Sequence, residues 1–144
     1  MSESRIKKTE DEIVDEFGLF NDWMGKYDYI IELGKNLPLI DTNYKNENYE
    51  VKGCQSKVWI NAEYKDGYLY YKADSDAVIT KGIISLLIRV LSGHKPEDIV
   101  NADMDFINKI GLKEHLSPNR ANGLNAMINK MKNFAQAYST HNVN

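Results

Sequence analysis

A change of hydrophobic period near the middle of the chain limits the fold more than any other feature. From Lys57 onward apolar and polar residues alternate, which is the pattern of a β-strand with one buried face. The residues that share the apolar face are Val58, Ile60, Ala62 and Tyr64. Asp66 and Gly67 follow, and Asp-Gly indicates a two-residue turn in which both residues have positive φ. Because Tyr68 to Ala73 supplies a returning strand, the sequence predicts an antiparallel hairpin.

Before the hairpin, apolar residues recur at helical spacing. Thr9 followed by Glu12 has the form of a capping box, so we expect the first helix to start near residue 9 and residues 1–8 to form a flexible tail. Asp22 can cap a second helix, which should end before Pro38 because a residue that precedes proline disfavours helical geometry.

The polar segment between Pro38 and Asn48 has no periodicity and predicts a solvated connection. The pattern allows a short early strand at Tyr49 to Lys52. In that case Gly53 and Cys54 lie between two strand-like segments.

After the hairpin the chain returns to helical patterns. Asp74, Ser75 and Asp76 offer side-chain caps for a helix that is apolar on nearly all sides and ends at Gly93. We therefore expect this helix to be central, and Asp74 and Asp76 to cap it rather than to form a catalytic carboxylate pair.

The last third of the chain predicts shorter helices followed by one long helix. Pro96 opens a turn, and Asp103 can cap a helix that Gly111 ends. Ser117-Pro118 is a paired N-cap and N1 signal for a final helix that runs to about Tyr138. Residues 139–144 are expected to form a flexible tail.

This order of elements predicts an α+β fold rather than alternating βαβ units. A length of 144 residues with 42% hydrophobic side chains is enough for one core. We expect residues 1–144 to form a single domain in which a small antiparallel sheet packs against several helices.

The charge balance disfavours some classes of partner. With 18 basic and 21 acidic side chains the net charge is −3, so the chain has no general attraction for nucleic acid or anionic lipid. The first dozen residues contain no apolar h-region of a signal peptide, and the longest apolar stretch, Ala77 to Leu91, is too short to span a bilayer. We expect a cytoplasmic protein.

The chain has one cysteine, Cys54. A single cysteine excludes an intramolecular disulfide, a cysteine-rich zinc site and an iron-sulfur cluster ligated by cysteines of one chain. Gly53 before it and the polar Gln55 and Ser56 after it predict a turn, where another protein can reach the thiol.

Reactivity of this thiol requires the thiolate, which nearby positive charge favours. Lys52 and Lys57 are close in sequence, and Arg120 is a candidate for proximity in the fold. The alternative for each is an ordinary solvated charge.

Other side chains are weaker candidates for chemistry. His94, His115 and His141 lack the spacing of a metal site, so we expect solvated or capping histidines. Lys81, Ser85 and Arg89 form a stripe that could contact a partner or line a cleft.

Five segments, in order, resemble the SufE-type cysteine desulfuration proteins. They are WMGKYDYIIELGKNLP at Trp23 to Pro38, GCQSKVW at Gly53 to Trp59, ADSDA at Ala73 to Ala77, KG at Lys81-Gly82 and LSPNRANGLNAM at Leu116 to Met127. The resemblance covers about residues 20–135. It implies an α+β fold related to the U-type iron-sulfur scaffold proteins, with the acceptor cysteine on a loop beside the sheet.

The resemblance also implies a function in iron-sulfur cluster assembly. Cys54 matches the cysteine that accepts persulfide sulfur from a cysteine desulfurase (SufS-like); the protein stimulates that enzyme and passes the sulfur to a cluster scaffold or another acceptor. Pyridoxal phosphate belongs to the desulfurase, and no cofactor is expected on this chain. The protein would be a transfer partner rather than a stand-alone enzyme, as a monomer or weak homodimer.

For the other matched positions we expect support rather than chemistry. Gly53, Gln55 and Ser56 would shape the loop, and Arg120 would contact the partner or the persulfide charge. An ordinary surface salt bridge is the alternative for Arg120.

Three other functions are also compatible with the sequence. An adaptor could dock on a desulfurase and stimulate it without carrying sulfur. An iron-sulfur scaffold is suggested by fold kinship alone, against which the single cysteine argues. A single-cysteine peroxidase would form sulfenic acid at Cys54 with peroxide.

Overall fold

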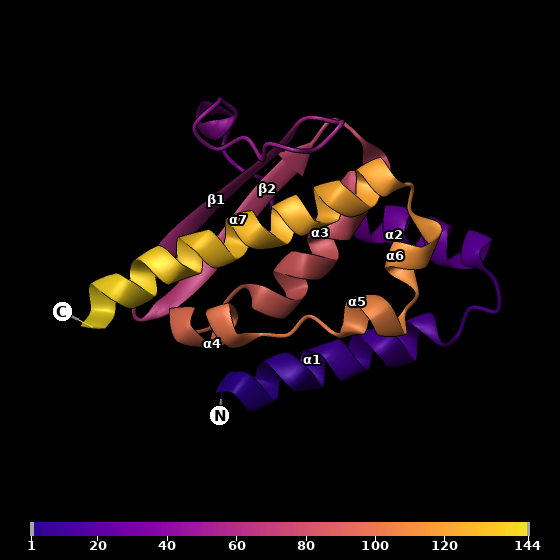
Figure 1. The fold of residues 1–144 in the computed structure, drawn as a ribbon, viewed down its shortest axis with the longest axis horizontal. Coiled ribbons are helices and arrows are strands. Elements are labelled where there is room, and N and C mark those ends of the chain that lie inside the picture. Colours follow the sequence, from indigo (N-terminus) through magenta and orange to yellow (C-terminus); the bar gives the residue numbers. More distant parts are fainter. Residues whose placement is uncertain (1, 144) are drawn as a thin grey trace.

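The computed structural model describes the backbone of residues 2–143 and the side chains of residues 5–139. It confirms the α+β class, because a two-stranded antiparallel sheet packs against helices (Figure 1). The elements are α1 (Ser2–Phe17), α2 (Trp23–Gly34), the 3₁₀ helix η1 (Thr42–Tyr44), β1 (Val58–Lys65), β2 (Tyr68–Ser75), α3 (Val78–Leu91), α4 (Pro96–Asn101), α5 (Phe106–Lys109), α6 (Leu112–His115) and α7 (Pro118–Val143).

The hairpin has the register that the alternating pattern predicts. Val58 pairs with Ser75 at one end and Lys65 with Tyr68 at the other. Asp66 and Gly67 have φ values of 54° and 91°, so both turn residues have the positive φ that a type I′ turn requires. The residues on the core face that are fully or almost fully buried are Val58, Ile60, Leu69, Tyr71 and Ala73.

Both edges of this small sheet are covered near Cys54 by the segment 38–51. Ile40 donates to the carbonyl of Ala73 on the β2 side, and Ile60 donates to the carbonyl of Tyr49 on the β1 side. The early strand that the pattern allowed is reduced to a single bridge, Glu50 to Trp59, with its neighbouring hydrogen bonds. The segment therefore protects the edges and leads directly into the Cys54 loop.

Helix α3 is central, as its apolar composition predicts. It contacts α1, α2, β2 and α7, and α7 crosses the hairpin and α3 in Figure 1. Helices α2 and α3 approach closely at Gly34 and Gly82: a Cβ on Gly82 would lie 2.0 Å from the carbonyl oxygen of Ile30. These glycines allow backbone-to-backbone contact.

The expected boundaries of the first and last helices are wrong. Helix α1 begins at Ser2, so residues 2–8 are helical rather than a tail, and Ile6 is buried in the core. Thr9 is inside the helix, where its hydroxyl donates to the carbonyl of Arg5. Helix α7 continues to Val143 instead of ending near Tyr138. Met1 and Asn144 lie outside the described residues.

The expected cap of α3 is also wrong. Its N-cap is Ala77, which makes no side-chain cap, because β2 extends to Ser75 and keeps Asp74 within the sheet. Asp74 instead forms ion pairs with Lys45 and Lys81. In contrast, the caps at Asp22 and Ser117 are confirmed: Asp22 accepts from the backbone N–H of Gly25, and Ser117 from that of Arg120.

None of the helices in the described part of the chain is both long and apolar enough to cross a membrane.

Candidate functional site

The Cys54 loop, residues 52–57, is held at both ends. Before it, the backbone N–H of Val51 donates to the carbonyl of Val58 at 2.8 Å. After it, Lys57 and Asp76 exchange two hydrogen bonds, one of which uses the Asp76 carboxylate. Gly53 has φ of 96°, a conformation that side chains other than glycine rarely adopt. This glycine turns the chain so that Cys54 faces α7.

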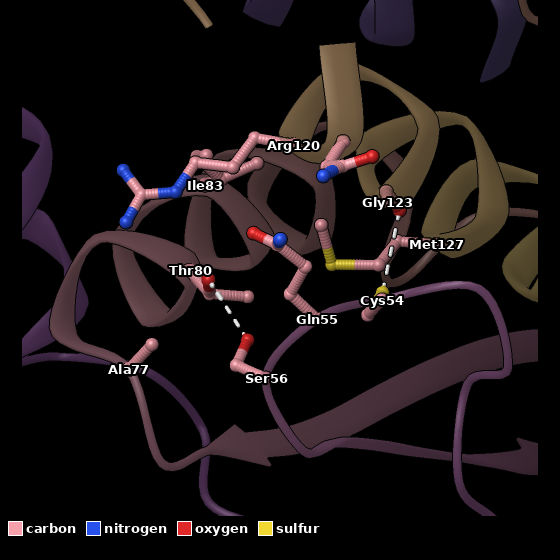
Figure 2. A pocket seen from close by; sticks show the side chains of 10 residues that line it. Cys54, Gln55, Ser56, Ala77, Thr80, Ile83, Arg120, Gly123 and Met127 are labelled. Atoms are coloured by element: carbon pink, nitrogen blue, oxygen red, sulfur yellow. Dashed lines mark hydrogen bonds between the residues drawn. The ribbon is translucent and has the colours of Figure 1, made fainter. Parts of the chain in front are cut away.

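The Cys54 thiol is half-buried rather than free at a loop tip. Its Sγ lies 3.6 Å from the carbonyl oxygen of Gly123, to which the thiol donates a hydrogen bond (Figure 2). Burial raises the pKa of Cys54 above its ordinary value, because a thiolate loses more hydration than a thiol does. In this resting geometry the sulfur is therefore protonated at neutral pH and weakly nucleophilic.

The hypothesis that neighbouring lysines lower the pKa of this thiol is wrong for the resting structure. Lys52 and Lys57 both pair with Glu50, at 3.6 and 3.4 Å. Desolvation dominates the pKa of Cys54, and no cation among the described residues offsets it.

Cys54 lines a small pocket between its loop, α3 and α7, with a volume of about 70 Å³. The lining residues are Cys54, Gln55, Ser56, Ala77, Thr80, Ile83, Asn119, Arg120, Gly123 and Met127. A cavity needs a volume of roughly 10–15 Å³ to hold one water molecule. The pocket is therefore large enough to hold a second sulfur atom on Cys54 together with water.

The structure brings the other candidate side chains from the sequence to this pocket. Gln55 and Arg120 line it, and the Ser56 hydroxyl lies 3.4 Å from that of Thr80 on α3. In Figure 2 the Arg120 guanidinium extends toward the Thr80 side, away from the sulfur. Arg120 is exposed, and among the described side chains no ion-pair partner faces it.

Sequence reasoning did not single out six of the lining residues: Ala77, Thr80, Ile83, Asn119, Gly123 and Met127. Gly123 had one available signal, because an isolated glycine inside a helical pattern costs stability and suggests a close approach. Met127 and Thr80 look like ordinary helix residues, so nothing local distinguishes them.

The remaining candidates make contacts within the chain. In the stripe on α3, Lys81 pairs with Asp74, Ser85 donates to the carbonyl of Leu33, and Arg89 pairs with Glu16. The stripe thus fixes helices and the sheet to one another.

The histidines differ from expectation in one case. His94 is 7% exposed, and its Nδ1 has no hydrogen-bond partner among the described residues, so the prediction of a solvated or capping histidine is wrong. His115 contacts the carbonyl of Gly111 through Nδ1 and stacks on Trp23. The side chain of His141 lies outside the described residues. Within the described part of the chain no three His, Cys, Asp or Glu side chains form a group that could hold a metal ion.

Comparison with known families places most of this chain within one of them. The model of the SufE family, described as an Fe-S metabolism associated domain, matches residues 11–135. That span includes the Cys54 loop, α3 and the part of α7 that lines the pocket.

Several curated proteins are similar along the chain. An uncharacterized SufE-like protein of Rhizobium meliloti (strain 1021) is 38% identical over 131 residues, which cover 88% of this chain and 94% of that protein. One of Rhizobium etli is 34% identical over 131 residues, covering 88% of each. SufE-like protein 1, chloroplastic/mitochondrial, of Arabidopsis thaliana is 38% identical over 125 residues, which are 86% of this chain but 34% of that longer protein.

A solved structure shares the fold. The solution structure of a hypothetical protein from Thermus thermophilus aligns with a TM-score of 0.76 at 20% identity, over 92% of this chain and 96% of that one. At this identity the match supports the α+β architecture alone.

Proposed function

This chain belongs to the SufE family of Fe-S metabolism associated domains, and from that premise we propose that it is a sulfur-transfer protein whose acceptor is Cys54. The donor is a cysteine desulfurase that uses pyridoxal phosphate. The recipient is an iron-sulfur scaffold or another thiol acceptor. The observation that carries the proposal is the position of the only cysteine of the chain: a free thiol on an anchored loop, beside a pocket with room for one more sulfur.

The transfer is an exchange at sulfur. The Cys54 thiolate attacks the outer sulfur of a persulfide on the desulfurase, and a new S–S bond forms to Cys54. The S–S bond of the donor breaks, and its electron pair leaves with the desulfurase thiolate. In the second step an acceptor thiolate attacks the outer sulfur on Cys54, and the Cys54 thiolate leaves. The number of S–S bonds is conserved in both steps, so neither needs an external oxidant or reductant.

The lone thiol suits the carriage of a persulfide. A second cysteine nearby could attack the inner sulfur, release sulfide and leave a disulfide. The sequence contains no second cysteine, so this loss of cargo within one chain is excluded.

In this proposal Cys54 becomes a reactive thiolate only after the desulfurase has docked. Because burial raises the pKa of the thiol, the resting protein holds little of the attacking thiolate. Docking of the desulfurase would move the thiol out of its buried position and restore its acidity. In this proposal Gly53, Gln55 and Ser56 shape the loop, and Arg120 contacts the partner or the negative charge of the persulfide.

An adaptor that stimulates a desulfurase without carrying sulfur is the second candidate, because a half-buried thiol of raised pKa also suits a protein that never exposes it fully. Cys54→Ser separates the two functions, since the hydroxyl preserves the approximate size of the side chain and its ability to donate a hydrogen bond. Sulfur transfer predicts that this variant binds the desulfurase as tightly as wild type but no longer accelerates turnover of L-cysteine. Retained acceleration would establish the adaptor instead.

A further inference from the structure

Gly123 on α7 is the residue on which Cys54 rests. A Cβ built at this glycine would have Cys54 atoms as its three nearest neighbours: Sγ at 3.3 Å, Cα at 3.7 Å and Cβ at 3.8 Å. Ala126 lies about one helical turn further along α7, and its Cβ would be 3.5 Å from a Cβ built on Gly53. The loop thus contacts α7 through Gly53 and Cys54, and the cysteine occupies the space that a side chain at position 123 would fill.

Helix formation does not account for a glycine at this position. Gly123 lies in the second turn of α7, where glycine is less favourable than alanine. Since the three nearest atoms outside its own stretch of helix all belong to Cys54, the space serves the cysteine rather than a helix crossing like that at Gly82.

The carbonyl of Gly123 adds a polar contact at the same point. It accepts the hydrogen bond of the Cys54 thiol, with Sγ and the oxygen 3.6 Å apart. A carbonyl oxygen has two lone pairs, so it can accept this bond in addition to the bond within the helix. A neutral thiol has the hydrogen that this contact requires.

We propose that Gly123 is a positioning residue of the sulfur acceptor: its missing side chain and its carbonyl oxygen together form a seat that holds Cys54 in the empty, protonated state. This inference rests on the proposed function for its biological meaning. The seat consists of the open position at Gly123 and its carbonyl oxygen, and it keeps the resting thiol half-buried and protonated.

The seat distinguishes the chemical states of Cys54. A thiolate has no hydrogen to donate, and its negative charge faces the partial negative charge of the carbonyl oxygen. In a persulfide, the outer sulfur takes the place of the hydrogen on Sγ, so Sγ again cannot donate. The seat therefore stabilises only the empty thiol, and both deprotonation and loading with sulfur weaken it.

Gly123→Ala tests the seat. The added methyl group would lie 3.3 Å from Sγ, closer than an ordinary contact, so the sulfur must move away from α7. We expect the rate of Cys54 alkylation by iodoacetamide at pH 7 to rise by about three- to tenfold, with a lower midpoint of the rate-against-pH profile, because a less buried thiol ionises more readily. The resistance of the variant to urea should equal or exceed that of wild type, because alanine favours the helix.

Asn125→Ala is the matched control. Asn125 is exposed on the same helix and does not line the pocket, so this variant also gains helix propensity without touching the sulfur. Its alkylation profile should match that of wild type. A Gly123→Ala profile within about twofold of wild type, with an unchanged midpoint, would overturn the proposal. Loss of stability without a change of midpoint would overturn it too, because it would show a merely structural role.

A measurement on the wild-type protein tests the seat without relying on the Gly123→Ala variant. The carbonyl ¹³C shift of Gly123, followed by NMR against pH, should titrate with the midpoint of Cys54, whereas that of Asn125 should not. Absence of that titration contradicts the seat. Neither experiment contains a desulfurase, so the seat and the sulfur-transfer function can fail independently of each other.

Discussion

The carboxylate of Asp76 accepts a hydrogen bond from the backbone N–H of Lys57 at 3.1 Å, and the backbone N–H of Asp76 donates to the carbonyl of Lys57 at 3.2 Å. These two bonds join the end of the Cys54 loop to the chain that enters α3. Asp76 therefore anchors the end of the Cys54 loop, although it does not line the pocket.

Asp76→Ala removes the side-chain bond and leaves the backbone bond. We expect a loss of about 0.5–1.5 kcal/mol in the free energy of unfolding and a several-fold faster alkylation of Cys54, because the loop opens more often. Urea denaturation and iodoacetamide kinetics measure the two effects. Asp76→Asn keeps the acceptor oxygen and should stay near wild type; if the asparagine and alanine variants react equally fast, the hydrogen bond is not what restrains the loop.

Gly82→Ala tests the close contact of α2 and α3. The new methyl group would meet the carbonyl of Ile30 at 2.0 Å, which only separation of the two helices can relieve. We expect destabilisation of about 3 kcal/mol or more, at the upper end of the costs of overpacking. Thermal unfolding measures it, and Val78→Ala, an exposed change on the same helix, is the control. A Gly82→Ala protein as stable as wild type contradicts the packing described.

Features that depend on residues close together in the sequence were predictable, and features that depend on residues far apart in the sequence were not. The hairpin was predictable because alternation and the Asp66-Gly67 turn are local, and Asp22 and Ser117 act within one helical turn. The cap of α3 was not predictable, because Asp74 instead accepts a hydrogen bond from Lys45, which lies 29 residues earlier in the chain. The seat of Cys54 joins residues 69 apart, so the sequence predicts a cysteine on an accessible turn but does not show that the fold half-buries the thiol against α7.

Asp74 links the segment before the Cys54 loop to α3. Burial alone would raise its pKa, but hydrogen bonds from Lys45, the backbone N–H of Ser75 and Lys81 outweigh that effect and hold the pKa below its ordinary value of 3.8. The folded state thus binds the proton less tightly than the unfolded state. The stabilisation is complete above the unfolded pKa and is lost as pH falls through the lower folded pKa.

Asp74→Asn should therefore cost about 1–2 kcal/mol at pH 7, since both lysines are partly exposed and screened. The difference from wild type should shrink below about pH 4. Urea denaturation across this range measures it. A difference that does not change with pH would mean that the charge of Asp74 contributes nothing.

His94 gives the fold a second dependence on pH. Burial lowers its pKa below 6.5, the Arg5 charge adds to that effect, and Asp98 opposes it. Because the unfolded chain binds the proton more readily, stability falls as pH drops below about 6.5 and levels off below the folded pKa. The slope in this window reaches at most about 1.4 kcal/mol per pH unit.

His94→Leu should flatten this part of the stability profile between about pH 7 and pH 5, because it removes the buried titrating group. Urea denaturation at closely spaced pH values tests it. His115→Leu is the control, since His115 is exposed and stacks on Trp23. If His94→Leu keeps the slope of wild type, another group is responsible.

The central claim is that Cys54 carries sulfur, and the mass of the protein tests it most directly. Wild type and Cys54→Ser would each be mixed with the desulfurase and L-cysteine without reductant, then measured intact and after digestion. Our account predicts that wild type gains one or more sulfur atoms, that the gain maps to Cys54, that a thiol reductant removes it, and that Cys54→Ser gains none. An unchanged mass of wild type, with docking to an active desulfurase confirmed, would contradict the account.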